Sequence, residues 1–242
     1  MRLDDLDLGE LCTRAKEAGA CSVADDILEE YSSAKDLIDR NPEKAAEWAY
    51  WYAVKCVKGR WPEAEPVIMR DPEVACDYAR NVIKGCWPEA ESVIMQDPEW
   101  AYRYAYSGGK GRWPEAEPAI MQSPYWAYQY ARCVIGGRWL EAEPVIMTDL
   151  NWTYWYALHV IKGRWPEAEP AIMQSLCWTS DYVLNVIKGR WPEAEPMILG
   201  YPPRAYWYAH EVIKGRWPEA EPVIMKDPGL ADLYTRHILQ KQ

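Results

Sequence analysis

Phenylalanine is absent from this chain of 242 residues, although 15 Trp and 17 Tyr are present. Core positions that evolve independently are usually occupied by several kinds of large residue. The exclusive use of Trp and Tyr as aromatic residues therefore indicates that one short template has been copied. Histidine is scarce as well, and its three copies lie far apart, at His159, His210 and His237. The chain also lacks the GxSxG, P-loop and GxGxxG motifs of common enzyme classes. We therefore predict that it is not an enzyme and has no catalytic residue, cofactor or metal site.

Paired cysteines and long apolar runs are missing too. The seven cysteines occur at irregular spacings and form no CxxC or Cys/His ligand pattern, so a disulfide framework is not expected. No apolar run approaches the ~20 residues that a membrane-spanning helix needs, and the acidic N-terminal segment lacks the apolar core of a signal peptide. We therefore predict a reducing, cytoplasmic location and no membrane partner.

A dominant basic region is the third absence. The net charge is −10, and residues 1–47 contain 13 acidic and 6 basic side chains, whereas residues 48–242 contain 24 and 21. The acidity therefore belongs mainly to the first 47 residues, and the rest is close to neutral. Binding to a phosphate backbone usually requires a basic stripe, so generic nucleic-acid binding is disfavoured.

What the sequence does contain is a repeat of 26 residues. Seven tryptophans follow one another at this unbroken spacing, and each begins a segment similar to WPEAEP. A fixed period between 20 and 50 residues is typical of solenoids, propellers and arrays. The seven tryptophans are Trp61, Trp87, Trp113, Trp139, Trp165, Trp191 and Trp217.

Each copy is interpreted as two helices. The first begins at a proline such as Pro62, which suits the first helical position, although the second proline, Pro66, should distort the first turn. The second is capped by Asp71 and ends at Lys84-Gly85, where glycine should supply the C-terminal stop. The apolar residues of this second helix recur with helical period and form one face: Val74, Ala75, Tyr78, Ala79, Val82 and Ile83. The sequence therefore predicts an all-α protein, a solenoid or superhelix of repeated αα-hairpins.

The repeat phase also predicts the division of the chain. We expect an N-terminal helical cap over residues 1–30 and a modified opening repeat over 31–60. The tandem two-helix repeats should occupy residues 61–228. A C-terminal capping helix is expected over 229–242, because its side chains are more polar and a stacked core requires polar ends.

The motif GRWPEAEPVIMRDPE, followed by segments similar to WAYRYA and by VIKGRWPEAEP, is the part of the sequence that is similar to other proteins. It resembles tandem repeats in uncharacterised proteins of bacteriophages and some bacteria, over roughly residues 41–228. That resemblance implies a helical repeat fold and a viral origin, hence the host cytoplasm. It implies no activity and no catalytic residues. In layout the chain is also similar to tetratricopeptide and HEAT-type solenoids, which bind other proteins, but that comparison is an analogy only.

Comparison among the copies separates a constant framework from a variable face. The second helix varies at the positions of Asp77, Arg80 and Asn81, which are spaced i, i+3 and i+4 and so share one side. Tryptophan occurs there three times, and it is favoured at binding hot spots. Two alternatives stay open: a solvated face that has drifted, and rings that cover the next helix or mediate self-association. The candidate partner-binding residues are Trp51, Arg103, Tyr106, Gln129, Arg132, Trp155, His159, Trp207 and His210.

The third copy differs from the others in its glycines. Gly108 and Gly109 replace the Val82-Ile83 pair, and glycine inside a helix costs about 1 kcal/mol relative to alanine. We predict a hinge or pocket there, with a tolerated recent change as the alternative.

Three functions are compatible with these features. The favoured one is a scaffold that binds a protein partner, such as a phage accessory factor acting on a host protein. The second is single-stranded nucleic-acid binding by Tyr and Trp stacking, with a lysine row for the phosphates. The third is a structural, self-assembling spacer. The lysine row consists of Lys58, Lys84, Lys110, Lys162, Lys188 and Lys214.

Overall fold

The structure is a computed structural model that describes residues 7–19 and 21–240. All regular secondary structure in these residues is helical, and short helices recur in pairs. The predicted all-α helical repeat fold is therefore confirmed. The chain divides into two compact units, Met1–Ile135 and Gly136–Gln242, and each is described by itself.

The first unit begins with a group of helices that precedes the regular repeats. Asp7, Ser33 and Asn41 cap three of these helices by accepting a hydrogen bond from a backbone N–H in the first turn, as short polar residues do at helix starts. The elements of the unit are α1 (Leu8–Glu17), α2 (Cys21–Glu30), α3 (Ala34–Arg40), α4 (Pro42–Tyr52), η2 (Ala53–Val57), α5 (Glu65–Ile68), α6 (Pro72–Tyr78), η3 (Ala79–Ile83), α7 (Pro88–Ile94), α8 (Pro98–Ser107), α9 (Glu117–Ile120), α10 (Pro124–Tyr130) and η4 (Ala131–Ile135).

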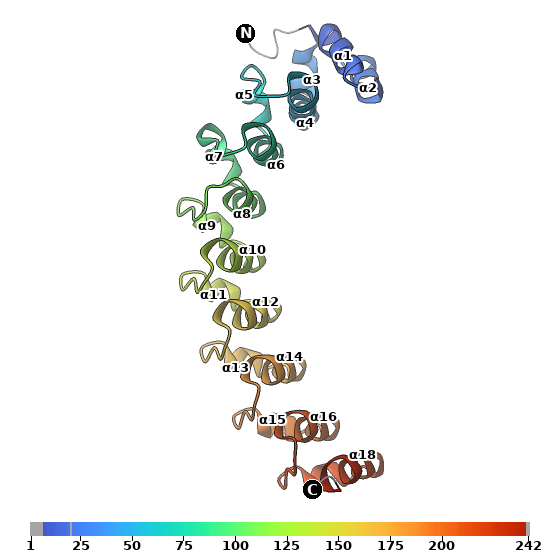
Figure 1. Cartoon of the computed structure of the whole chain (residues 1–242), viewed down its shortest axis with the longest axis vertical. Coiled ribbons are helices and arrows are strands. Elements are labelled where there is room, and N and C mark those ends of the chain that lie inside the picture. Colours follow the sequence, from blue (N-terminus) through green and yellow to red (C-terminus); the bar gives the residue numbers. More distant parts are fainter. Residues whose placement is uncertain (1–6, 20, 241–242) are drawn as a thin grey trace. The chain divides into compact units, whose positions relative to one another are not determined.

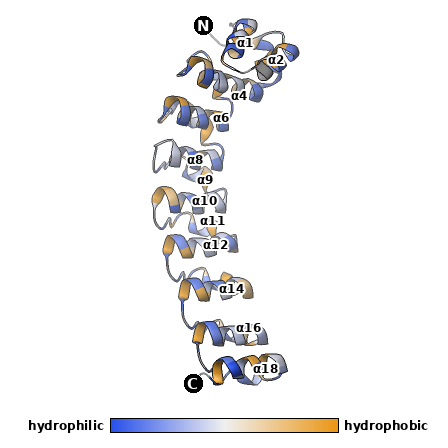
Figure 2. Cartoon of the chain, turned by 45° about the vertical axis from the view of Figure 1, so that its right-hand side comes forward, coloured by the Kyte–Doolittle hydropathy of each residue, from blue (hydrophilic) through white to orange (hydrophobic). Residues whose placement is uncertain are grey.

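The second unit consists of regular repeats. Within each unit the very short helices lie on one side and the longer helices stack on the other (Figure 1). Each longer helix carries both hydrophobic and hydrophilic segments (Figure 2). The elements of the second unit are α11 (Glu143–Ile146), α12 (Leu150–Tyr156), η5 (Ala157–Ile161), α13 (Glu169–Ile172), α14 (Leu176–Tyr182), η6 (Val183–Ile187), α15 (Glu195–Leu199), α16 (Pro202–Trp207), η7 (Tyr208–Ile213), α17 (Glu221–Ile224), α18 (Pro228–Tyr234) and η8 (Thr235–Leu239).

The first helix of a repeat is shorter than predicted. It does not begin at Pro62, because a turn precedes it and α-helix starts only at Glu65. The cause is Pro66, whose ring removes a backbone N–H and restricts the residue before it. In the second copy Ser92 stands at this position, and α7 there extends back to its proline, Pro88. The predicted distortion of the first turn by Pro66 is thus confirmed.

The second helix begins as predicted but ends differently. Asp71 caps α6 by accepting a hydrogen bond from the N–H of Val74 at 3.0 Å. The helix then widens into the π-helical segment η3, and the residue that follows it, Lys84, is left-handed with φ of 60°. The prediction that Gly85 supplies the stop is therefore wrong, because the π-helical turn places the left-handed position one residue earlier.

A clamp that joins the two helices of a repeat holds the core. The backbone N–H of Trp61 donates to the hydroxyl of Tyr78 at 2.7 Å, and that hydroxyl donates to Glu65 at 3.2 Å. Arg60 donates twice to the same carboxylate, at 2.9 Å each. Burial raises the pKa of Tyr78 to about 12, so its hydroxyl stays protonated.

This Trp–Tyr–Glu clamp recurs in every copy, always with the same spacing in sequence. Its rings are buried, and the alanines beside them are buried as well, so the small side chains let the helices approach closely. The tyrosines are Tyr78, Tyr104, Tyr130, Tyr156, Tyr182, Tyr208 and Tyr234.

Candidate partner-binding face

The tryptophans of the variable face are less accessible than predicted. Trp51, Trp155 and Trp207 are half-buried rather than exposed. The indole N–H of Trp155 donates to Asn151 at 3.1 Å, and its ring stacks on His159 with centroids 5.0 Å apart. Packing against its own helix therefore takes up part of the Trp155 ring, because a large apolar surface is driven out of water wherever a neighbour can cover it.

The third variable position bridges neighbouring repeats. Asn81 donates to the hydroxyl of Tyr50 at 2.7 Å, and Asn185 donates to Tyr154 at 3.0 Å across the same 31-residue interval. This position therefore serves the stacking of each repeat on the preceding one. The role of these tyrosines in joining repeats is not evident from the sequence, although a tyrosine recurs four residues before the variable Arg80-type position in most copies.

The same bridge recurs near the end of the second unit, next to the predicted partner-binding residue His210. Tyr206 and the Nδ1 atom of His237 are hydrogen-bonded at 2.7 Å. His210 lies beside this pair, with its ring 5.6 Å from that of His237, and its own Nδ1 is 2.8 Å from Glu211. The Nδ1 atom of His210 is thus engaged within the unit.

In the first unit, α8 and α10 bring an aromatic group to the surface. The ring of Tyr106 is 60% exposed, and it stacks on Tyr102 with an interplanar angle of 8°. Tyr102 in turn stacks on Trp126 at 5.3 Å, and Trp126 contacts Tyr125 at 4.4 Å. We call Tyr102, Tyr106, Tyr125 and Trp126 the aromatic patch.

Three further predicted residues flank this patch. The guanidinium of Arg103 lies over the ring of Trp100 at 4.7 Å and pairs with Glu99. Gln129 donates to the hydroxyl of Tyr125 at 3.1 Å. Arg132 donates to the hydroxyl of Tyr128 at 3.1 Å. Gln129 thus contacts the patch through Tyr125, whereas Arg103 contacts Trp100 and Arg132 contacts Tyr128. These residues and Tyr106 lie on α8, α10 and η4 of the first unit, whereas Trp155, His159, Trp207 and His210 lie in the other unit.

Rigid aromatic rings beside guanidinium groups can bind a polypeptide in two ways. The exposed face of Tyr106 offers apolar and stacking contact at low entropic cost, and the two arginines offer charge-assisted hydrogen bonds to carboxylates or backbone carbonyls. Burial raises the pKa of Tyr102 and Tyr128, so these phenols remain neutral hydrogen-bonding groups. The patch therefore combines the residue types that dominate binding hot spots.

The two glycines of the third copy lie at the end of a helix. The sequence places them inside the second helix, at an expected hinge or pocket, but α8 ends at Ser107, Gly108 is its C-terminal cap, and Gly109 adopts φ of 76°. A Cβ atom on Gly108 would lie 2.5 Å from the carbonyl oxygen of Tyr104. The proposed hinge therefore corresponds to a sharp turn after α8, and mobility at that turn remains a prediction.

A cavity of about 810 Å³ lies between α1 and η2 of the first unit. The residues that line it include charged side chains of both signs, Glu10, Glu17, Lys55 and Lys58, together with Trp61. Within residues 7–19 and 21–240, no group of three or more His, Cys, Asp or Glu side chains could hold a metal ion.

None of the helices in the described part of the chain combines the length and apolarity required to cross a bilayer. Comparison of the chain with protein families, curated proteins and solved structures gave no match.

Proposed function

We propose that this protein is a non-enzymatic helical repeat scaffold that binds a protein partner through the aromatic patch and its flanking arginines. The observation that supports this most directly is Tyr106, which is 60% exposed although it is stacked on Tyr102. An aromatic ring held rigidly at the surface loses little entropy on binding. Its neighbours Arg103 and Arg132 supply the polar contacts that give such a surface specificity.

The resemblance to phage and bacterial repeat proteins suggests which partner to seek. On that basis the scaffold acts as a viral accessory factor on a host protein, in the host cytoplasm. The six cysteines that the structure describes are all free, which suits a reducing compartment.

The test is affinity capture from bacterial lysate, with and without nuclease, followed by mass spectrometry. Wild type is compared with Tyr106→Ala and with Leu184→Ala, a matched control at the same repeat position whose side chain is 43% exposed. We expect one host protein that resists nuclease, is retained by wild type and by the control, and is lost with Tyr106→Ala. With the purified partner, Tyr106→Ala should weaken the dissociation constant by about tenfold or more, as truncation of a hot spot does.

Two other outcomes would contradict this proposal. Equal retention by all three proteins would mean that the aromatic patch does not bind the partner. Loss of the captured material after nuclease treatment would favour the single-stranded nucleic-acid alternative, in which Tyr and Trp stack on bases.

A further inference from the structure

In five copies, the loop after the second helix contains a lysine followed by a glycine, the reverse of the order that their backbone conformations favour. Lysine occupies a left-handed position with φ between 55° and 60°, and the glycine that follows it does not have a positive φ. A Cβ atom on that glycine would have no other atom within 4 Å of it. The five loops of this kind are Lys58-Gly59, Lys84-Gly85, Lys162-Gly163, Lys188-Gly189 and Lys214-Gly215.

Folding alone does not account for this order. The left-handed conformation is strained for any residue with a Cβ atom and is open to glycine. Gly136, with φ of 73°, stands at the lysine position of another copy, so glycine suits this backbone. The glycine of each pair has no internal reason to lack a side chain, but a bare backbone lets another molecule approach closely. Strain and openness that recur at the surface therefore point to a contact outside the chain.

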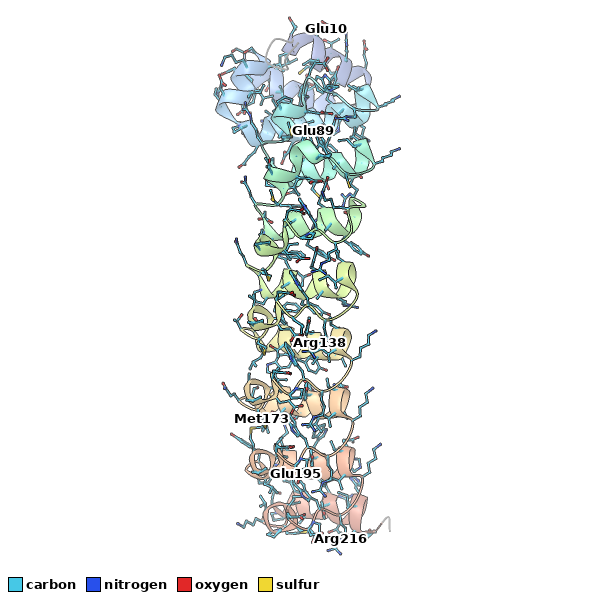
Figure 3. All side chains as sticks on the ribbon, turned by 90° about the vertical axis from the view of Figure 1, so that its left-hand side faces the viewer. Glu10, Glu89, Arg138, Met173, Glu195 and Arg216 are labelled. Atoms are coloured by element: carbon cyan, nitrogen blue, oxygen red, sulfur yellow. The ribbon has the colours of Figure 1, made fainter. Side chains whose placement is uncertain are left out.

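The charges beside these loops in the second unit are balanced. Arg164 and Glu169 neutralise each other at 2.7 Å, and the same pair recurs as Arg190 with Glu195 and Arg216 with Glu221. Arg138, Glu195 and Arg216 lie along one face of this unit (Figure 3). Each repeat also contains one exposed lysine and one exposed glutamate that lie within ion-pair distance of no partner in the described residues: Lys162, Lys188 and Lys214, and Glu167, Glu193 and Glu219. The charge of each glutamate still acts on the arginine of the preceding repeat, as that of Glu193 does on Arg164.

These residues form two rows. The lysine and the glutamate of a repeat are five residues apart in one loop, and the loop recurs every 26 residues, so the rows run side by side. The prolines on either side of each glutamate are exposed as well.

We infer that the second unit docks through these two rows against a second copy of this chain. A two-fold axis parallel to the rows places the lysines of each copy against the glutamates of the other, repeat against repeat, which is an isologous contact. A partner must match the row spacing over several repeats, and a second copy does so by construction. Each loop contributes weakly, but three loops per copy engage together and their contributions combine. This contact uses residues other than the aromatic patch, so it stands or falls independently of the proposed function.

The test is sedimentation velocity with the full chain at about 100 µM, a concentration at which weak dimers form. Wild type should associate at about 50 mM NaCl, and at about 500 mM NaCl the association should weaken about tenfold or more, because salt screens exposed charges. A variant with Lys162→Glu, Lys188→Glu and Lys214→Glu should be monomeric. So should a variant with Glu167→Lys, Glu193→Lys and Glu219→Lys. A mixture of equal amounts of the two variants should associate again. Monomeric wild type, or a mixture that stays monomeric, would overturn the inference.

A third variant excludes misfolding as the cause. Lys162→Gly, Lys188→Gly and Lys214→Gly together remove the ammonium groups and relieve the left-handed strain. We expect a thermal midpoint at or above that of wild type and loss of association. If this variant still associates as wild type does, the lysines do not form the contact and the inference is wrong.

Discussion

Glu91 in the first unit and Glu169 in the second occupy the same place in their repeats, but different residues neutralise them. Glu169 pairs with Arg164, five residues earlier, at 2.7 and 2.8 Å. Glu91 has no such arginine because Cys86 stands there, and it pairs instead with Lys110, 19 residues later, at 2.6 and 2.7 Å. The difference teaches that the clamp needs a cation beside its carboxylate, whichever repeat supplies it.

The backbone at the end of the second helix also differs between the two regions. This difference accompanies the replacement of the arginine by Lys110 as the cation beside the carboxylate. In the second unit, α14 continues through η6 and the left-handed residue is Lys188. In the first unit, α8 has no π-helical extension, and Gly109 takes the positive φ in place of a lysine. Lys110 is thereby released from the left-handed position and contacts Glu91. The glycines predicted as a hinge thus have a second explanation, namely compensation for the lost arginine.

The largest expected effect concerns what the two regions share, the buried tyrosine of the clamp. Burial raises the pKa of Tyr78, Tyr182 and Tyr208 to about 12, whereas an unfolded tyrosine has a pKa of about 10. A raised folded pKa stabilises the fold fully below about pH 10, and this stabilisation is lost as the pH rises towards about 12. We expect cooperative unfolding in that window.

The measurement is tyrosinate absorbance followed together with far-ultraviolet circular dichroism during alkaline titration. The largest rise in tyrosinate absorbance should coincide with the loss of helix, because the clamp tyrosines ionise only as the fold opens. Ionisation of all tyrosines near pH 10 without loss of helix would show that the clamp hydroxyls are accessible in the folded chain.

The second prediction removes the tryptophan of the clamp from each region in turn. Trp87→Ala and Trp165→Ala both delete a fully buried ring, so each should lower the free energy of unfolding by about 3–5 kcal/mol in urea titrations. Leu140→Ala, at a side chain that is 64% exposed, serves as the control and should change little. A much smaller loss for Trp87→Ala than for Trp165→Ala would mean that the irregular repeat depends less on its buried tryptophan ring.

The third prediction concerns Lys110, the cation that takes the place of the arginine beside Glu91. Lys110→Met leaves the largely buried carboxylate of Glu91 without its cationic partner and should lower the free energy of unfolding by about 1–2 kcal/mol. Lys162→Met, at an exposed lysine without an ion pair in the described structure, should stay within about 0.5 kcal/mol.

A double-mutant cycle tests the origin of this effect. Adding Cys86→Arg restores the arginine found in the other copies and should recover most of the stability lost with Lys110→Met. Additive effects of Cys86→Arg and Lys110→Met would show that position 86 and Lys110 do not serve the same carboxylate.

The sequence predicts those parts of the fold that depend on local chemistry. The tryptophan period, the Asp71 cap and the disturbance at Pro66 all follow from residues close in the chain. Tyr78 is recognised in sequence only as part of an apolar stripe. Its hydroxyl joins Trp61 and Glu65, which are 17 and 13 residues away, so the clamp becomes visible only once the helices are packed.

The candidate site is predicted less well for a similar reason. The spacing of the variable positions places them on one side of the helix, but side chains such as Asn81 bond to the preceding repeat. Sequence comparison within the chain cannot separate variation that maintains stacking from variation that binds a partner. Among the aromatic residues at the variable positions, Tyr106 alone is exposed, whereas Trp51, Trp155 and Trp207 are half-buried.

The smallest expected effect exchanges the left-handed residues of two copies. Lys188→Gly should raise the free energy of unfolding by about 0.5 kcal/mol, because relief of left-handed strain outweighs the greater flexibility of glycine in the unfolded chain. Gly136→Lys should lower it by a similar amount, since it introduces the strain where glycine now avoids it. Gly189→Ala, at a glycine whose φ is not positive and whose added Cβ would meet no atom within 4 Å, should be neutral or slightly stabilising. Urea unfolding of the three single variants checks the signs. If Lys188→Gly destabilises the fold, the lysine side chain stabilises its own repeat, and its retention among the copies no longer requires a second molecule.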